Sequence, residues 1–262
     1  MSRLIPPSSS PAPPPDCDHL WRDVYGDLQR FGPAHYHERR LARNLLAPLE
    51  YGSLLDVGCG RGWNTEQLAR ERGLTRVLGL DLSEVAVSEA QSRCPELRFA
   101  VHDLERSAPA GRWDLVHCSL VLHLIPDDRA AVRHLRACTG RYLLISTMVG
   151  DFERHRAWET HLGAVRNYRK GELETMLVEA GFAIRTALYW GFPFYSPLVR
   201  ALQDRAGVGT GRYGWSTRIA ATALRNLFYL NSAARGDLLV VLAEVPDRTD
   251  VAPERSEVGA VE

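Results

Sequence analysis

Short apolar segments alternate with segments of helical periodicity along most of the chain. The apolar runs are four to six residues long and rich in valine, leucine and isoleucine, which is typical of buried strands. Strands separated by helices of about ten residues require crossover connections. The pattern therefore predicts a mostly parallel sheet, with strands at 54–57, 76–80, 97–101, 113–118 and 142–146 and helices at 64–72, 83–93 and 127–138.

The last third of the chain continues this pattern with one interruption. A helix at 171–180 ends before Gly181, and strands follow at 182–188 and 237–245, which makes seven strands in all. Residues 191–236 separate the last two strands and contain a further helical stretch at 217–230. Because this segment is far longer than an ordinary loop, we expect a helical lid insertion before the last strand that faces the substrate.

Both ends of the chain lack the pattern of a folded core. Residues 1–18 are rich in proline and serine and are expected to form a disordered tail, and residues 246–262 are expected to form a second one. Residues 19–245 then make up one domain, which is long enough to bury a substantial core.

Charge and composition exclude several classes of protein. The 262 residues carry 32 basic and 32 acidic side chains, and this balance argues against a nucleic-acid binder. The longest uncharged run, at 186–199, has 14 residues and is too short to span a membrane. Five scattered cysteines without a C-x-x-C pair predict free thiols and no metal site. With no signal peptide at the N-terminus, a cytoplasmic protein is expected.

A glycine-rich turn follows the first strand, with the sequence Asp56-Val-Gly58-Cys59-Gly60-Arg-Gly62. Glycine permits a tight turn and lets a ligand approach the backbone. The spacing differs from the dinucleotide fingerprint G-x-G-x-x-G. The acid at Asp56 would repel a pyrophosphate but accept hydrogen bonds from an ammonium group. The turn therefore favours a cofactor with a cationic amine over a nicotinamide dinucleotide.

Two further acids end the next two strands. Asp81 ends the second strand, where a carboxylate in this type of sheet binds the hydroxyls of a ribose. Asp103 ends the third strand and could accept a hydrogen bond from the exocyclic amine of adenine while Leu104 covers the ring. Each acid could instead cap a helix. Three acids at the carboxyl ends of successive strands nevertheless predict one shared crevice.

These motifs resemble those of the class I S-adenosylmethionine-dependent methyltransferases, in the small-molecule branch related to ubiquinone and menaquinone biosynthesis. The resemblance spans residues 36–245 and includes LLDVGCGRG, GLDLS, HDLE and WDLVHCSLVLH. It implies a Rossmann-like α/β fold with helices on both faces of the sheet, and S-adenosyl-L-methionine as the cofactor. The cofactor-binding residues that it implies are Asp56, Gly58, Cys59, Gly60 and Gly62 for the methionine part, Asp81 and the adjoining Leu82 around the ribose, Asp103 and Leu104 for the adenine, and Cys118 and Ser119 near the sulfonium.

The acceptor is left open by these motifs. The Asn/Asp-Pro-Pro-Tyr/Phe motif of enzymes that methylate planar amines is absent after the fourth strand. O-methylation of a small organic molecule, in specialised, quinone or lipid-type metabolism, is therefore favoured, and N- or C-methylation is an alternative. A regulatory protein that binds S-adenosylmethionine without catalysis is another, because the family has no obligatory catalytic side chain.

Two histidines are candidates for a general base, since the pKa of histidine lies near neutrality. His123 follows the fourth strand and faces the crevice in this fold, and His161 lies three places before the position where relatives carry a histidine. A structural hydrogen bond is the alternative for each. We also expect Tyr36, Arg166 and Tyr168 to contact the acceptor, on the basis of the same resemblance, with an ordinary surface helix as the alternative for Tyr36.

The insertion at 191–236 is basic and aromatic. Six arginines in it stand against one acid, Asp204. A lid whose arginines bind an anionic or carrier-bound acceptor would have this composition, and so would a peripheral membrane contact. An ordinary packed extension with solvated arginines is the alternative interpretation.

Overall fold

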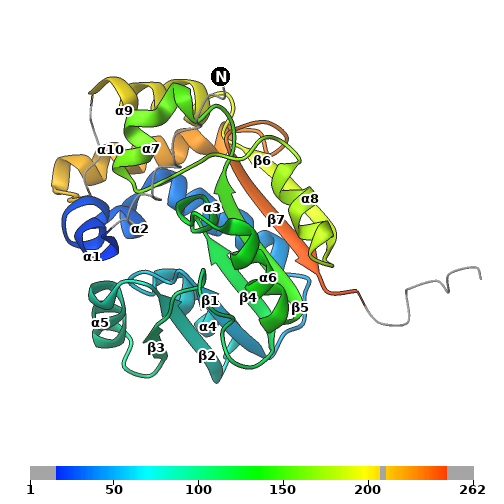
Figure 1. Ribbon diagram of the computed structural model, residues 1–262. Helices are drawn as coiled ribbons and strands as arrows, with labels where there is room; N and C mark the ends of the chain where they lie inside the picture. Colours follow the sequence, from blue (N-terminus) through cyan, green and yellow to red (C-terminus); the bar gives the residue numbers. More distant parts are fainter. Residues whose placement is uncertain (1–15, 207–210, 247–262) are drawn as a thin grey trace, which may run out of the picture.

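The computed structural model describes residues 16–206 and 211–246, and Figure 1 shows a central sheet with helices around it. The sheet has seven strands in the spatial order β3-β2-β1-β4-β5-β7-β6. The first five pair in parallel, and β7 runs antiparallel to both β5 and β6. The predicted seven-stranded, mostly parallel sheet is thus confirmed, with strands β1 (Ser53–Val57), β2 (Arg76–Asp81), β3 (Arg98–Val101), β4 (Trp113–Ser119), β5 (Thr139–Met148), β6 (Ala183–Trp190) and β7 (Leu238–Glu244).

Four helices of the predicted pattern begin and end within one residue of the expected positions. Local capping explains this agreement: the side chain of Ser83 accepts a hydrogen bond from the amide of Ala86, and that of Asp127 accepts one from the amide of Ala130. These helices are α4 (Trp63–Arg72), α5 (Glu84–Arg93), α6 (Asp128–Cys138) and α8 (Glu172–Glu179).

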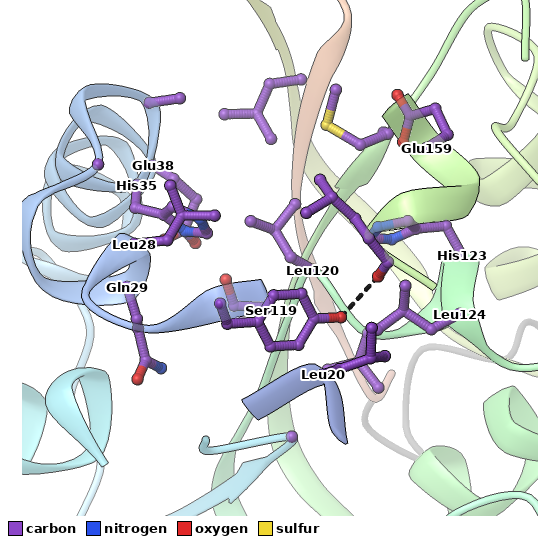
Figure 2. A pocket seen from close by; sticks show the side chains of 18 of the residues that line it. Leu20, Leu28, Gln29, His35, Glu38, Ser119, Leu120, His123, Leu124 and Glu159 are labelled. Atoms are coloured by element: carbon purple, nitrogen blue, oxygen red, sulfur yellow. Dashed lines mark hydrogen bonds between the residues drawn. The ribbon is translucent and has the colours of Figure 1, made fainter. Parts of the chain in front are cut away.

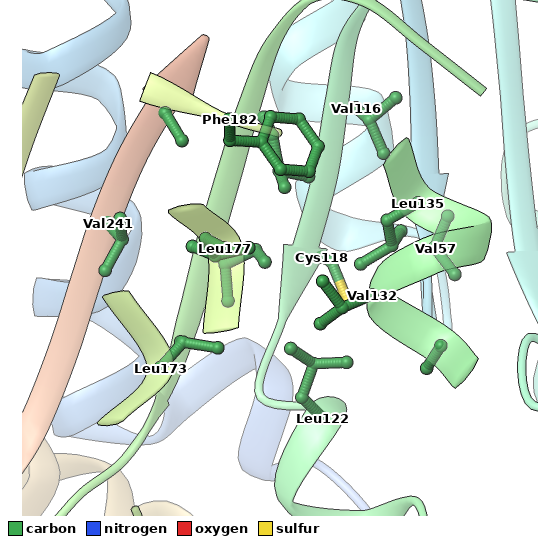
Figure 3. Packing of buried hydrophobic residues seen from close by; sticks show 14 of the residues in the cluster. Val57, Val116, Cys118, Leu122, Val132, Leu135, Leu173, Leu177, Phe182 and Val241 are labelled. Carbon is green, nitrogen blue, oxygen red and sulfur yellow. The ribbon is translucent and has the colours of Figure 1, made fainter. Parts of the chain in front are cut away.

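Hydrophobic side chains pack on both faces of the sheet. The central strand β5 is buried on both sides, and its Leu143, Leu144 and Ile145 are fully inaccessible to solvent. On one face, α6 and α8 cover the sheet through residues such as Leu135 and Leu177 (Figure 3). On the other face, α3 (Pro33–Leu46) and α4 complete a second cluster. Helices on both faces are therefore confirmed.

The folded chain begins earlier than the expected boundary at residue 19. The side chain of Asp16 caps α1 (Cys17–His19), and Asp18 accepts hydrogen bonds from the Ser83 hydroxyl and the Val85 amide. Residues 16–18 are thus held against the start of α5, which corrects the expected tail over residues 1–18. Residues 1–15 and 247–262 lie outside the described residues. After α1 come η1 (Leu20–Tyr25), a π-helix, and α2 (Leu28–Phe31).

The insertion between β6 and β7 is helical, as expected. It contains η4 (Tyr195–Val199), α9 (Arg200–Ala206), α10 (Trp215–Leu227) and η5 (Phe228–Leu230). Phe228 is fully buried, and its ring meets that of Trp190 at 5.8 Å between centroids. The insertion is therefore packed against the hydrophobic core through Phe228. Three shorter helices lie between β4 and β6 in the chain: η2 (Leu122–Leu124), η3 (Glu153–His155) and α7 (Arg156–His161).

Candidate active site

A cavity of about 270 Å³ opens at the carboxyl ends of the parallel strands. One side is formed by the N-terminal helices and another by η2, α7 and the insertion. Figure 2 shows His35 and Glu38 of α3 on the opposite side of this cavity from His123 and Glu159. Seven of the predicted site residues line it: Gly58, Asp81, Leu82, Asp103, Leu104, Ser119 and His123.

The glycine turn joins β1 directly to α4. Gly58, Gly60 and Gly62 all have positive φ angles, of 73°, 55° and 74°, which glycine adopts without strain. The amides of Gly58 and Cys59 both donate to the carbonyl of Leu80, so the turn is tied to the end of β2. The glycines are thus needed for the turn itself, and only Gly58 lines the cavity.

Asp81 lies in the cavity at the end of β2, with 8% of its surface exposed. Its two carboxylate oxygens accept hydrogen bonds from the backbone amides of Gly60, at 2.8 Å, and Ser83, at 2.9 Å. Burial raises the pKa of Asp81 to about 6, against the effect of these amides. A carboxylate has about four lone-pair sites, so Asp81 retains capacity for two further donors such as the hydroxyls of a ribose.

The neighbouring part of the cavity suits a flat polar ring. Leu82 and Leu104 both line it, and Leu104 is buried. One carboxylate oxygen of Asp103 accepts the amide of Glu105 at 2.9 Å, and the other lies 3.1 Å from the guanidinium of Arg106. The carboxylate of Asp103 is thus partly engaged, but it remains at the surface of the cavity.

Asp56 does not line the cavity, contrary to expectation. It is buried, and its carboxylate accepts hydrogen bonds from the Thr65 hydroxyl at 2.5 Å and from Nδ1 of His117 at 2.7 Å. Each of its two oxygens accepts one of these hydrogen bonds. The acid of the glycine motif therefore holds β1, β4 and α4 together, and its part in binding a cofactor stays a prediction.

Four other predicted cofactor residues also lie outside the cavity. Cys118 alternates with Ser119 along β4, so its side chain points into the core on the opposite face. Cys59 is 1% exposed beneath the turn. Gly60 is covered by the ring of Trp21, and Gly62 begins α4. Contact of Cys59, Gly60, Gly62 and Cys118 with a cofactor stays a prediction that the lining of this cavity does not support.

The N-terminal helices cover the glycine turn. The sequence did not predict the contacts through which they do so. The amide nitrogen of the Gln29 side chain donates to the carbonyl of Cys59, and its oxygen accepts the amide of Arg61. Trp21, Tyr25 and Leu28 line the cavity from the same segment. The Tyr25 hydroxyl donates to the carbonyl of Leu162 at 2.6 Å and so joins this cover to the segment that follows α7.

Of the two histidines predicted as bases, the structure brings only His123 to the cavity. Nδ1 of His123 lies 3.3 Å from the hydroxyl of Thr147. Burial, together with the charges of Arg200 and Arg166, lowers the pKa of His123 to about 3, so the ring is neutral at physiological pH. His161 does not line the cavity, since it ends α7 with its ring beside Trp158.

The three predicted substrate residues lie elsewhere. The hydroxyl of Tyr36 is hydrogen-bonded to that of Tyr229 at 2.8 Å, on the outer side of α3. Tyr168 donates to Asp128 at 2.9 Å, and Arg166 forms an ion pair with the same carboxylate. In the structure Tyr36, Arg166 and Tyr168 thus bind other side chains and do not line the cavity, and their contact with an acceptor stays a prediction.

Among the described side chains of the insertion, one arginine lines the cavity, and this arginine is already paired. Arg200 is 1% exposed, donates to Asp237 at 2.7 Å and forms a second ion pair with Glu159. Other arginines of the insertion stack on rings outside the cavity: Arg218 on Phe31, Arg225 on Tyr36 and Arg235 on Phe192. The expected group of anion-binding arginines over the site is not formed by these residues.

Glu38 is a site residue that the sequence interpretation missed. It is 1% exposed, lines the cavity and accepts a hydrogen bond from the Ser146 hydroxyl at 3.0 Å. A signal existed, because Ala34, Glu38, Leu41 and Leu45 recur at the three- and four-residue steps of a buried helix face. A carboxylate on that face predicts a ligand or a partner.

The chain matches the family model described as a methyltransferase domain over residues 28–187. This match covers more than half of the chain. The protein belongs to this methyltransferase family.

Several curated relatives are trans-aconitate 2-methyltransferases. That of Variovorax paradoxus is 36% identical over 102 residues, which are 37% of this chain and 39% of the relative. That of Escherichia coli O7:K1 is 26% identical over 178 residues, which are 61% of this chain and 68% of the relative. The chain thus spans about two fifths of the length of the first of these relatives.

Solved structures share the fold at low identity. The [4+2]-cyclase SpnF has a TM-score of 0.57 and 22% identity, with 86% of each chain covered. Magnesium protoporphyrin IX methyltransferase of Synechocystis, solved with bound S-adenosylhomocysteine, has a TM-score of 0.53 and 18% identity, covering 82% of this chain and 86% of its own. These likenesses confirm the class I methyltransferase fold. Within the described residues, no helix is long and apolar enough to cross a membrane, and no cluster of metal-ligating side chains occurs.

Proposed function

We propose that the protein transfers a methyl group from S-adenosyl-L-methionine to an oxygen of a small organic acceptor. The main support for this proposal is that a single continuous cavity contains both the predicted cofactor site and the space for an acceptor. It joins Asp81, Leu82 and Leu104 at the ends of β2 and β3 to His123 and the apolar side chains that follow β4 and β5. A nucleoside at the first end would place its reactive group toward the second.

The residues at the first end match the polar groups of this cofactor. Asp81 retains two acceptor sites for ribose hydroxyls, and Leu82 and Leu104 offer apolar contact to the adenine. An ammonium group requires acceptors as well. Oδ1 of Asn64 is buried in the described structure without a hydrogen-bond partner, and the carboxylate of Glu38 lines the same cavity. Asn64 replaces Asp56 as our candidate for binding the amino group, and Glu38 lies on the side of the cavity opposite His123.

Bound S-adenosylmethionine supplies a methyl group activated by its sulfonium, and transfer to a hydroxyl oxygen leaves S-adenosylhomocysteine and a proton. The chain's own task is alignment and exclusion of water. Neutral His123 has a lone pair that can accept a hydrogen bond from the acceptor's hydroxyl and so position it, and Thr147 orients the ring through Nδ1. Trp158, Leu162, Tyr195 and Phe228 surround the remaining space with apolar surface.

Oxygen is favoured as the acceptor atom by the missing Asn/Asp-Pro-Pro motif and by the imidazole at the acceptor end. N- or C-methylation is the alternative, and so is a non-catalytic protein that binds the cofactor. The curated relatives are named for trans-aconitate, which gives no support to a quinone or lipid pathway in particular. A cytoplasmic location is part of this proposal, supported by five cysteines that are all free thiols.

Two measurements test the proposal. Titration calorimetry should show binding of S-adenosylmethionine and S-adenosylhomocysteine, and incubation with methyl-labelled cofactor and a host metabolite extract should label a small molecule. Asp81→Ala protein is the control, since it should lose both signals. Binding of NADH without a response to either sulfur compound would replace this function with a dehydrogenase-like one.

A further inference from the structure

The acceptor end of the cavity carries no free positive charge among its described residues. Arg200 is the one arginine that lines it, and Glu159 and Asp237 flank its guanidinium. The imidazoles of His123 and His35 are neutral, because burial lowers the pKa of each to about 3. Neither histidine can therefore attract an anion at neutral pH.

Negative groups outnumber positive ones in the same region. Glu38 and Glu159 both line the cavity and both are buried, with 1% and 2% of their surfaces exposed. A carboxylate brought between them would lose its water and find like charges within a medium of low dielectric. The remaining lining at this end is apolar or aromatic, including Met148, Trp158 and Phe228.

We propose that the acceptor chamber selects an uncharged, mainly apolar alcohol or phenol and rejects carboxylates. This inference rests on the methyl transfer proposed above and narrows its acceptor. It separates this chain from relatives named for trans-aconitate, a tricarboxylic acid. Buried aromatic surface supplies the affinity for such a molecule, and His123 is the polar group that meets its hydroxyl.

The test compares two isosteric phenols that differ in charge, 4-hydroxybenzamide and 4-hydroxybenzoate, with trans-aconitate as a third probe. Calorimetry on wild-type protein saturated with S-adenosylhomocysteine should show the amide binding at least about tenfold more tightly than either carboxylate. Equal or tighter binding of a carboxylate, or no binding of the amide, overturns the inference. Failure of S-adenosylhomocysteine itself to bind would overturn the proposed function instead.

A variant tests whether Glu159 is the residue that makes the cavity reject 4-hydroxybenzoate. Glu159→Gln leaves Arg200 with one carboxylate partner, so binding of 4-hydroxybenzoate should improve about tenfold while that of the amide stays within twofold. Glu153→Gln, which removes an exposed charge in the neighbouring helix, is the matched control and should change neither. The comparison of the two phenols on wild-type protein decides the question even where Glu159→Gln does not fold.

A separate surface also calls for a partner. Helix α10 packs on α3 through its buried Ala221, yet its outer side is apolar as well. Trp215 is 79% exposed and Ile219 is 62% exposed, and these two residues and Leu227 lie within about a third of the helix circumference. Tyr229 and Leu230 extend this exposed apolar face into η5.

The charged side chains within the segment that carries this face are all of one sign. Residues 211–236 contain four arginines and no acid: Arg212, Arg218, Arg225 and Arg235. A second copy of the chain would bring the same arginines face to face, which opposes self-association here. We infer that the α10 face binds the surface of an anionic membrane, with Trp215 at the interface and the arginines near lipid phosphates.

Co-sedimentation with vesicles tests this inference. Phosphatidylglycerol vesicles should pellet the full chain, and phosphatidylcholine vesicles should not. The double variant Trp215→Ser/Ile219→Ser should bind the anionic vesicles about tenfold less, whereas Val178→Ser, at an exposed valine of α8, should bind normally. Equal sedimentation of both variants, or a wild-type dimer that the double variant dissociates, would overturn the membrane assignment.

Discussion

Asp56 of β1 and His117 of β4 face each other in register across two paired strands, with Nδ1 of His117 2.7 Å from Oδ1 of Asp56. Both side chains are about 1% exposed. Burial opposes protonation of His117, but the nearby carboxylate prevails and raises its pKa above the usual value. The acid of the glycine motif thus belongs to a buried ion pair in the sheet.

Removing the imidazole should destabilise the protein strongly. In a His117→Ala variant the buried carboxylate of Asp56 keeps only the Thr65 hydroxyl, and we expect a loss of about 3–5 kcal/mol in the free energy of unfolding. Denaturant unfolding measures this loss. His19→Ala, which breaks an exposed pair with Asp23, is the control and should change stability by less than about 1 kcal/mol.

The same pair predicts a pH dependence. Because the pKa of His117 is raised in the folded state, its contribution is fully present below the ordinary histidine pKa of about 6.5 and is lost as pH rises through the folded value. Stability should therefore fall with rising pH above about 6.5. A wild-type curve parallel to that of His117→Ala in this range would show that the pair does not titrate.

Asp81→Asn should weaken the binding of S-adenosylhomocysteine by about 1.5–3 kcal/mol, the range for hydrogen bonds to a charged group. Because burial raises the pKa of Asp81 to about 6, the ionised carboxylate is lost below that pH, and wild-type affinity should decline there. Calorimetry between pH 5 and 8 measures both effects. Asp23→Asn, at an exposed acid, is the control, and unchanged affinity in Asp81→Asn would make Asp81 a structural cap.

The folded-state pKa of Asp81 also acts on stability. A carboxyl group with a raised folded pKa binds protons more tightly than in the unfolded chain, so its contribution to stability falls as pH rises from about 4 to about 6. Asp81→Asn should lack this slope. The difference between the two unfolding curves over this range is the measurement, and identical slopes would contradict a buried, titrating Asp81.

Gly60→Ala should displace the N-terminal cover of the site. A β-carbon at Gly60 would lie 2.3 Å from the Trp21 ring, at a φ of 55°. We expect a loss of about 2–4 kcal/mol in stability, from backbone strain and overlap together. Trp21→Ala should relieve the overlap, so the double variant should lose less than the sum of the single ones. Gly73→Ala is the control for strain alone, since its φ is 62° and no atom lies within 4 Å.

His123→Ala should reduce the turnover number by about a hundredfold or more while S-adenosylhomocysteine affinity is retained, because the imidazole lies at the acceptor end. His161→Ala is the matched control and should keep full turnover. With a pKa of about 3, His123 should add no titration to the rate between pH 5 and 8. Full activity in His123→Ala would exclude a role for His123 in positioning the acceptor's hydroxyl.

The sequence by itself determined the sheet, the helices that connect it and the end of the sheet at which the cavity opens. Leu143, Leu144 and Ile145 form a continuous apolar run because both faces of β5 are buried, and such runs are readable without a structure. Asp81 and Asp103 were readable for a related reason: the carboxyl ends of parallel strands meet at one edge whatever the surrounding side chains are.

Only the tertiary structure decided which of the motif residues reach the cavity. Asp56 is drawn away by His117, a residue 61 positions later that becomes its neighbour only when β1 and β4 pair. In the same way, the ion pairs of Arg200 with Glu159 and Asp237 form only in the folded chain. The partner of a buried charge is the oppositely charged group that packing brings near it, and this depends on contacts between residues far apart in the sequence. Local periodicity predicts the elements, whereas the pairing of charges between elements settles the chemistry of the site.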